Sequence, residues 1–579
     1  MRWNTLSRTG RTVLPWLLVA TGLGVASYTT TGYQYQVWPQ DFLEYVLRYA
    51  GRLQGDWTTS TPNQHWAFAH ALALVPASLL SGTVFVLWLL SLGGVWLAFA
   101  AVCRAFGLSW PSVLGAGLVA ASTGFAGLGL SRPVIGFLHP TAVSFALTVA
   151  ALAAVLYAKP VLVGLALGLA ILVHPDVGVL GTLAVLPAQV LTTPMRPWRR
   201  HLPLVLALVI PAAPAFYYAF TNLALGSSLT EHRRYVLLAL VRLPWHFLYR
   251  AFPAAEWAMA VGWVLVFIIA IPFLPSDRRR RTLVVTAIAS VTLCTLGGIA
   301  SQFGRPLLLV QLQTARLTSL LVLLGIVAGF AAVHRFAGRW TGVVGVLVFL
   351  LAPPLQNAVL GNHQLPGRLA TLVSTSSAEA AIVLLVIAGL GWALRGQMIR
   401  DQDSRAEPVV FGGLLVAAAL TLAVPFQNVW AAKPSQAQRD WVAIAKDSRA
   451  VSRPRDIFLV PPGGLQLFPL WAFRPVVATF GSWEFGVGDS EWVRRISIVT
   501  GGDPRVFKPT GSANAIARNQ LIESDYDHTV ATSRKPVCAF NVRFVVVESP
   551  VAAPAWLERL DATSTYDLYK VRPGTCGRT

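Results

Sequence analysis

Carboxylates are scarce over most of this chain, so the side chains that could serve as a general base are few. The chain has 579 residues, with 25 acidic and 46 basic side chains, and more than half of the acids follow Trp430. Asp41 and Glu44 stand in the stretch PQDFLEYVLRYAGRLQGDW, just after the first hydrophobic run. An ionised carboxylate within hydrogen-bond reach of a hydroxyl group can remove its proton. Asp41 and Glu44 are therefore the candidate catalytic residues.

The same spacing has a structural interpretation. Asp41 and Glu44 are three residues apart, as in a capping box, and Leu43, Leu47, Ala50 and Leu53 then form an apolar stripe. This pattern is typical of a capped amphipathic helix that lies on a bilayer surface. Asp56, in the Gly-Asp-Trp turn that ends the stretch, is a further acid predicted on the outer face of the membrane, as Asp41 and Glu44 are.

Arginines supply candidate binding sites for a phosphate group. Cations meet the negative charge that develops on a leaving phosphate. Five arginines fall at predicted outer ends of hydrophobic spans: Arg132, Arg233, Arg234, Arg305 and Arg316. A single arginine there is also explained by a side chain that reaches toward the interface. The consecutive pair Arg233-Arg234 runs against the usual charge bias of outer loops, which favours a binding role.

Two His-Pro pairs, His139-Pro140 and His174-Pro175, occur at predicted outer span ends. Proline readily starts a helix, so helix initiation with a capping imidazole accounts for both. The functional alternative places His139, His174 and Asp176 along a substrate cavity. His174 and Asp176 could also ligate a divalent cation, although two ligands do not define a metal site. The sequence has no HExxH, CxxC, Walker or GxGxxG motif, which argues against soluble nucleotide chemistry.

The elements that must position these residues are predicted to be transmembrane helices. Hydrophobic residues make up 55% of the chain and charged residues 12%, and the mean hydropathy is +0.59. Hydrophobic windows of about 20 residues can cross a bilayer with every backbone group bonded internally. The pattern predicts an α-helical polytopic membrane protein with about thirteen spans. These lie near residues 12–31, 83–103, 110–130, 141–157, 161–174, 177–193, 202–222, 254–274, 282–302, 317–334, 340–359, 379–396 and 409–427.

Basic residues predict the orientation of these spans. Arginine clusters such as Arg278 to Arg281 fall in short loops on one side, which places them and the N-terminus in the cytoplasm. An odd number of spans then puts the C-terminus in the periplasm, and the spans are predicted to lie in a bacterial inner membrane. The net charge of +21 is explained by these loops and their contact with phospholipid, so nucleic acid is not an expected partner.

The composition changes after about residue 427, where apolar runs shorten and acids become common. We therefore divide the chain into a transmembrane domain, 1–427, with a first periplasmic loop at 33–66, and a soluble periplasmic domain, 428–579. Helix-like and strand-like segments alternate in the tail, which predicts a small α/β domain. Strand-like runs include 457–462, 475–480, 540–549 and 566–572. Cys538 and Cys576 both lie in this tail, where an oxidising periplasm would permit a disulfide bond.

The first loop resembles that of a known superfamily. The pattern D-x-x-x-Y-x-x-R-Y-A-x-R-L-x-G-D-W, from Asp41 to Trp57, is similar to the first periplasmic loop of GT-C glycosyltransferases of the aminoarabinose transferase and protein O-mannosyltransferase type. The number of spans and the outer C-terminal domain also resemble that architecture. The resemblance implies a transferase that takes a sugar from a polyprenyl-phosphate donor in the bilayer, with Asp41 as general base.

Two other functions remain open on the sequence. The family often has two adjacent acids in this loop, whereas Phe42 follows Asp41 here. This departure favours the alternative of a membrane assembly or transport component that keeps the scaffold without its chemistry. A secondary transporter would instead show inverted repeats and acids at mid-span, and neither is evident in the sequence.

Overall fold

The computed structural model describes residues 41–341 and 435–577, apart from 62, 64, 124–126, 129–137, 193–200, 224–228, 243, 253, 339–340, 463–467, 480–487, 509–514 and 550–552. The described residues fall into two compact units. The bundle unit takes them from Leu87–Ala213 and Trp245–Ala431. The tail unit takes them from Ala26–Val86, Pro214–Pro244 and Ala432–Thr579. The first loop thus groups with the C-terminal tail, and each unit is described below by itself.

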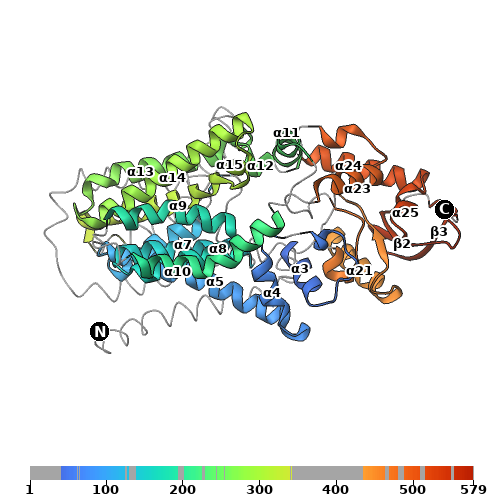
Figure 1. Cartoon of the computed structure of the whole chain (residues 1–579), viewed down its shortest axis with the longest axis horizontal. Helices are drawn as coiled ribbons and strands as arrows, with labels where there is room; N and C mark the ends of the chain where they lie inside the picture. The colour runs from blue at the N-terminus through green and yellow to red at the C-terminus, as the bar shows by residue number, and fades with distance from the viewer. Residues whose placement is uncertain are drawn as a thin grey trace. The chain divides into compact units, whose positions relative to one another are not determined.

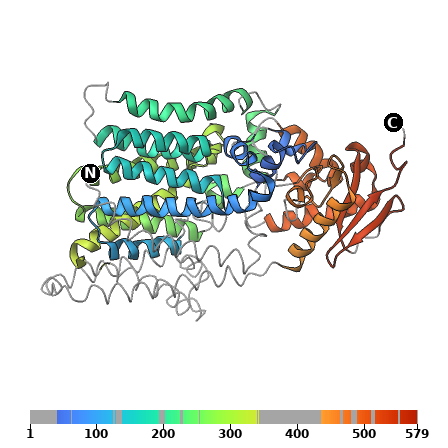
Figure 2. The ribbon, with the colours of Figure 1, turned by 90° about the horizontal axis from the view of Figure 1, so that it is seen from below.

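Nine of the predicted spans coincide with helices in the described part of the chain. The helices are α5 (Ala77–Ala105), α6 (Trp110–Thr123), α7 (Pro140–Leu156), α8 (Pro160–Val173), α9 (Pro175–Thr192), α10 (Leu202–Tyr218), α13 (Ala254–Ala270), α14 (Arg278–Phe303) and α16 (Thr318–Ala337). In the bundle unit the helices α7, α8, α9, α13 and α14 lie side by side with their axes roughly aligned (Figures 1 and 2). The predicted spans at 12–31, 340–359, 379–396 and 409–427 lie outside the described residues, save for Thr341.

Length and composition support a membrane location for the bundle. Five described helical segments are long and apolar enough to cross a membrane: Ser78–Ala105, Pro175–Thr192, Leu202–Thr221, Arg278–Phe303 and Thr314–Arg335. Short helices connect the longer ones, namely η3 (Ala219–Leu223), α11 (Glu231–Tyr235), η4 (Val236–Arg242), α12 (Pro244–Phe247), η5 (Tyr249–Ala251), η6 (Ile271–Phe273), α15 (Leu307–Gln311) and η7 (Thr314–Leu317).

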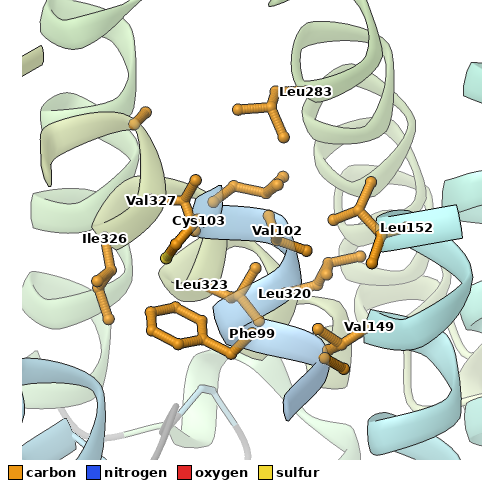
Figure 3. Close-up of a cluster of buried hydrophobic side chains, with 14 of the residues drawn as sticks. Phe99, Val102, Cys103, Val149, Leu152, Leu283, Leu320, Leu323, Ile326 and Val327 are labelled. Carbon is orange, nitrogen blue, oxygen red and sulfur yellow. The ribbon is translucent and has the colours of Figure 1, made fainter. Parts of the chain in front are cut away.

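The bundle core is built around α16, which other helices surround. Leu320, Leu323 and Val327 of α16 pack in one apolar cluster with Phe99 of α5 and Leu152 of α7 (Figure 3). Small residues let neighbouring helices approach closely. A Cβ atom on Gly168 of α8 would lie 2.4 Å from the backbone oxygen of Leu208 in α10, so only glycine fits there. Close approach of this kind is typical of helix packing in membranes.

The bundle has a basic end, which we define by Arg104, Lys159, Arg278 to Arg281 and Arg335. Hydrogen bonds join the elements that meet there: the Tyr157 hydroxyl donates to the Ala101 carbonyl, and Arg335 donates to the Phe273 carbonyl. The cations that the sequence assigns to cytoplasmic loops therefore share one end of the described bundle. This grouping agrees with the charge bias on which the predicted orientation rests.

The tail unit contains a four-stranded sheet with the order β1-β2-β4-β3. Its strands are β1 (Ile457–Leu459), β2 (Val542–Glu548), β3 (Leu557–Ala562) and β4 (Tyr566–Val571). β1 pairs with β2 in parallel, whereas β4 is antiparallel to both β2 and β3. The predicted strand at 475–480 is reduced to a single bridge between Val476 and Phe458. Red strands at one side of Figure 2 mark the sheet.

Helices cover both faces of this sheet. They are α21 (Gln436–Val451), α22 (Phe468–Ala472), α23 (Asp489–Val499), η11 (Pro504–Phe507), α24 (Ala515–Thr532) and α25 (Lys535–Ala539). On β2, Val545 packs with Trp492 of α23 and Tyr526 of α24, whereas Phe544 and Val546 pack on the other face, with α21 and α22. Because both faces are covered, β2 is a nearly continuous apolar run. The small α/β structure expected in the tail is present.

The two cysteines of the tail are bonded to each other. The Sγ atoms of Cys538 and Cys576 are 2.11 Å apart, and the bridge joins α25 to the turn that follows β4. Cys103 and Cys294, in the bundle helices, are free thiols. The two bridged cysteines are 38 positions apart in sequence, and the segment between them contains the three strands β2, β3 and β4.

A half-buried carboxyl group makes the stability of the tail depend on pH. Burial raises the pKa of Asp527 in α24 from 3.8 to about 7, and the carboxylates of Glu548 and Glu523 act in the same direction. An acid whose pKa rises on folding binds more protons in the folded state. Its stabilising contribution is therefore complete below pH of about 4 and is lost as the pH rises toward 7.

We expect Asp527→Asn to stabilise the tail at neutral pH, by on the order of 1 kcal/mol, and to have little effect near pH 4. Hydrogen exchange of β2 and α24 peptides in the full chain, measured at both pH values, checks this. The exposed Glu558 provides the control, because Glu558→Gln removes a charge without relieving burial. Equal slowing of exchange by Asp527→Asn at both pH values would contradict the assignment.

Candidate functional site

Four of the predicted site residues meet at the end of the bundle opposite the basic end. His139 immediately precedes α7, His174 follows α8, Asp176 lies in the first turn of α9, and Arg316 lies in η7, just before α16. Because successive helices alternate in direction, the start of α7, the end of α8 and the start of α9 share one end. We call these four residues the histidine end.

Arg316 and His174 form the centre of this group. Nη1 of Arg316 is 3.3 Å from Nε2 of His174, and His174 is fully buried. A guanidinium group only donates hydrogen bonds, so Nε2 of His174 must be the acceptor and carries no hydrogen. Among the described residues, the other guanidinium N–H groups of Arg316 have no acceptor at hydrogen-bond distance. They remain available to an anion.

The other two members complete the electrostatics of the histidine end. His139 caps α7, because its Nδ1 accepts a hydrogen bond from the backbone N–H of Thr141 at 3.0 Å. Its ring centre lies 6.2 Å from that of His174. Asp176 interacts electrostatically with Arg316 and is also favoured by the positive end of the α9 dipole. The predicted capping role of His139 is confirmed, and it leaves Nε2 of the ring as its donor atom.

A strained turn positions Arg316. Gln313 has φ 51° and ψ 51°, a left-handed backbone that residues other than glycine seldom adopt, and it is only 6% exposed. Its backbone carbonyl accepts a hydrogen bond from the N–H of Arg316 at 2.9 Å. Its side-chain Oε1 is buried and has no hydrogen-bond partner within the described ranges. Strain of this kind is frequent at functional sites.

Neighbouring helices hold this turn in place. The hydroxyl groups of Thr314 and Tyr249 are 2.9 Å apart, and Sγ of Cys294 donates to the Thr314 carbonyl at 3.2 Å. A Cβ atom on Gly297 would lie 1.6 Å from Oγ1 of Thr314, so α14 can reach the turn only with glycine at this position. Neither the left-handed turn nor the glycine contact could be predicted from the sequence, because neither has a local sequence signal.

The remaining candidates that the structure describes are arranged differently. In the tail unit, Asp41 is the first residue of α3 (Asp41–Tyr49), and Glu44 is buried one turn later. Arg234 forms an ion pair of 3.2 Å with the buried Asp489, whereas Arg233 is exposed. In the bundle unit Arg305 is exposed. Arg132 lies outside the described residues.

The predicted surface helix of the first loop is instead packed into the tail unit. Leu43, Leu47 and Leu53 are almost fully buried, and α3 packs against α4 (Trp66–Ala73) and α22. Asp56 is buried as well: its Oδ2 accepts from the N–H of Thr59 at 2.9 Å and its Oδ1 from that of Val476 at 3.3 Å. Burial raises the pKa of Asp56, and the hydrogen bonds from Thr59 and Val476 oppose that shift. Asp56 therefore ties the first loop to the tail.

We expect Asp56→Ala to destabilise the tail unit by about 1–3 kcal/mol, because two buried N–H groups would lose their acceptor. Faster hydrogen exchange in peptides covering Thr59 and Val476, measured in the full chain, would report the loss. Gln54→Ala is the matched control, because the hydrogen bond that Gln54 accepts from Arg455 is exposed to solvent. Unchanged exchange in the Asp56 variant would show that the two bonds contribute nothing.

Metal binding gains no support from the described residues. Within residues 41–341 and 435–577, gaps excepted, no group of three or more His, Cys, Asp or Glu side chains is arranged to hold a metal ion. His174 is engaged by Arg316, and the predicted pair His174 and Asp176 gains no third ligand there. The histidine end is better suited to an anion than to a cation.

Comparison with known proteins identifies the fold. No protein-family model matches the chain, and no curated protein sequence matches it. Among solved structures, apo ArnT from Cupriavidus metallidurans is 16% identical, with a TM-score of 0.51 over 99% of this chain and 100% of that one. ArnT from the same organism bound to undecaprenyl phosphate gives 14% identity and a TM-score of 0.48, covering 98% and 100%.

A third structure is the Archaeoglobus fulgidus oligosaccharyltransferase tethered to an acceptor peptide. It is 12% identical, with a TM-score of 0.44 over 93% of this chain and 69% of that one. At these identities only the likeness to apo ArnT carries weight, and it concerns the fold. The likeness to apo ArnT over nearly the whole of both chains shows that this chain has a similar fold, as the resemblance of the first loop predicted.

Proposed function

We propose that this chain is a membrane glycosyltransferase that takes a sugar from a polyprenyl-phosphate carrier. The observation that supports this most strongly is the hydrogen bond between Arg316 and the buried His174, at one end of a helical bundle with a fold like that of ArnT. A lipid-linked donor suits that position, because its prenyl chain lies among membrane helices while its phosphate lies at their ends. ArnT itself has been solved with undecaprenyl phosphate, which is a donor carrier of this class.

In the proposed reaction an acceptor hydroxyl oxygen attacks the anomeric carbon of the donor sugar. The new carbon–oxygen bond forms as the bond from that carbon to the phosphate oxygen breaks, and the electron pair leaves with the polyprenyl phosphate. Asp41 takes the proton of the hydroxyl group. Arg316 donates to the phosphate as its negative charge develops, which lowers the barrier most if the donors are held in place beforehand.

Each neighbour of Arg316 has a positioning role in this proposal. His174 accepts one guanidinium N–H and so fixes the plane of the group. The Gln313 carbonyl holds the backbone of η7, and Asp176 offsets part of the positive charge while no donor is bound. His139, whose ring lies beside that of His174, is assigned as a further substrate contact. We assign Arg132, Arg233, Arg234 and Arg305 as further substrate contacts on their sequence positions alone, and propose a periplasmic acceptor.

The direct test is transfer by the purified full chain. Undecaprenyl-phosphate-linked sugars would be supplied one at a time with membrane lipid extracts, and glycosylated products followed by mass spectrometry. We expect one donor to be consumed, with equal amounts of product and undecaprenyl phosphate. If the protein bound undecaprenyl phosphate but consumed no donor, the non-enzymatic alternative suggested by Phe42 would be favoured.

A further inference from the structure

The basic end of the bundle contains a hollow of about 380 Å³ between the end of α9 and the start of α14. It is lined by Leu191, Thr192, Arg280, Arg281, Val284 and Val285. The four α14 residues lie on one face of the helix by their spacing. The hydroxyl groups of Thr192 and Thr282 are 3.1 Å apart and buried, so the two helices are joined directly beside the hollow.

Two of the lining side chains are cations without a counterion in the described structure. Asp277 caps α14, and the Arg279 side chain lies 3.9 Å from its carboxylate. The guanidinium groups of Arg280 and Arg281 engage no acceptor among the described residues. Both lie in the first turn of α14, where a positive charge opposes the helix dipole. An anion in the hollow would relieve this repulsion and bond both side chains.

An apolar stripe continues from the hollow along α14. Val284 is followed by Ile288, which is 60% exposed, and by Val291, which is 41% exposed. These residues are four and three positions apart, so they share one face of the helix. The stripe lies on a helix long and apolar enough to cross a membrane. A small anion such as phosphate would leave this stripe unused, whereas a lipid would cover it with an acyl chain.

We propose that the hollow binds an anionic glycerophospholipid. Its phosphate lies between Arg280 and Arg281, and one acyl chain runs along Val284, Ile288 and Val291. A zwitterionic lipid fits less well, because its ammonium group would add a positive charge to this end. The site goes beyond the proposed transferase function and does not depend on it, because Arg316 lies at the opposite end of the bundle.

The experiment measures binding of phosphatidylglycerol to the purified full chain by native mass spectrometry. We expect Arg280→Gln and Arg281→Gln each to weaken binding about fivefold, the effect of one cation near a lipid phosphate. Arg279→Gln is the matched control, because it removes the same charge from the same helix turn but does not line the hollow. Arg280→Lys should retain most of the affinity, and Arg316→Gln all of it.

Several outcomes would overturn the proposal. A loss with Arg279→Gln equal to that with Arg280→Gln would indicate diffuse surface charge and no defined site. If phosphatidylcholine bound as tightly as phosphatidylglycerol, the site would not require an anion. If glycerol phosphate bound as tightly, the site would not require an acyl chain. Should a glutamine variant fail to fold, Val284→Trp fills the hollow and leaves every charge in place. Unchanged phosphatidylglycerol binding by that variant would also exclude the site.

Discussion

Replacing Arg316 by glutamine should lower the rate of sugar transfer about 100- to 1000-fold, the loss seen when one preorganised donor to a developing negative charge is removed. Glutamine keeps a polar side chain that can still bond Nε2 of His174, so the fold of η7 should survive. What is lost is the positive charge and the fork of N–H groups that face no described acceptor. Single-turnover transfer with the donor identified for the wild type measures this.

Arg305 supplies the matched control for Arg316. It also follows the C-terminal end of α14 in sequence, but it is exposed and makes no described ion pair. We expect Arg305→Gln to reduce the rate by less than about fivefold, because an exposed cation contributes little even where it contacts the substrate. A rate for Arg316→Gln within about threefold of the wild type would contradict the assigned role. A loss of equal size in both variants would point to a general effect of charge on donor approach.

Replacing Asp41 by asparagine should reduce the rate about 100- to 10,000-fold, the contribution that general bases typically make. Asparagine has the same size but cannot take a proton from the acceptor hydroxyl group. The affinity for undecaprenyl phosphate should stay unchanged, because the base acts on the acceptor. Single-turnover transfer and donor binding, measured on the same preparation, separate these two effects.

Glu44 decides whether the base is assigned to the correct carboxylate. It lies one helical turn after Asp41 and is buried in the tail unit. We expect Glu44→Gln to keep most of the activity, because a side chain buried inside the tail unit contributes to packing and not to the proton transfer. If Glu44→Gln lost transfer while Asp41→Asn retained it, Glu44 would be the base. If both variants kept full rates, the loop would take no part in the chemistry.

Long hydrophobic windows predicted the helices of the bundle well, because a chain segment in a membrane can satisfy its backbone in few other ways. The His-Pro pairs also marked helix starts correctly: α7 begins at Pro140 and α9 at Pro175. Proximity in space was harder to predict. That His174 and Arg316 are hydrogen-bonded follows from helix packing over 142 positions in the sequence, for which no local pattern exists.

The first loop shows where sequence patterns mislead. Its apolar stripe is compatible with a bilayer surface, but the structure buries Leu43 and Leu47 inside the tail unit. Amphipathicity indicates that one face will be covered and does not say by what. In the tail, β2 and β4 were predicted because they are strongly apolar. α24 and β3 were not, because α24 is largely polar and five of the six β3 residues are exposed.

The most direct test of the proposed donor site is equilibrium binding of undecaprenyl phosphate and of undecaprenol to the wild type and to Arg316→Gln. The two ligands share the prenyl chain and differ in the phosphate, so their affinity ratio isolates the anion contact. We predict that the wild type prefers the phosphate by at least about tenfold and that Arg316→Gln loses this preference while binding undecaprenol as before. Equal preference for the phosphate in the two proteins would contradict a polyprenyl-phosphate site at the histidine end.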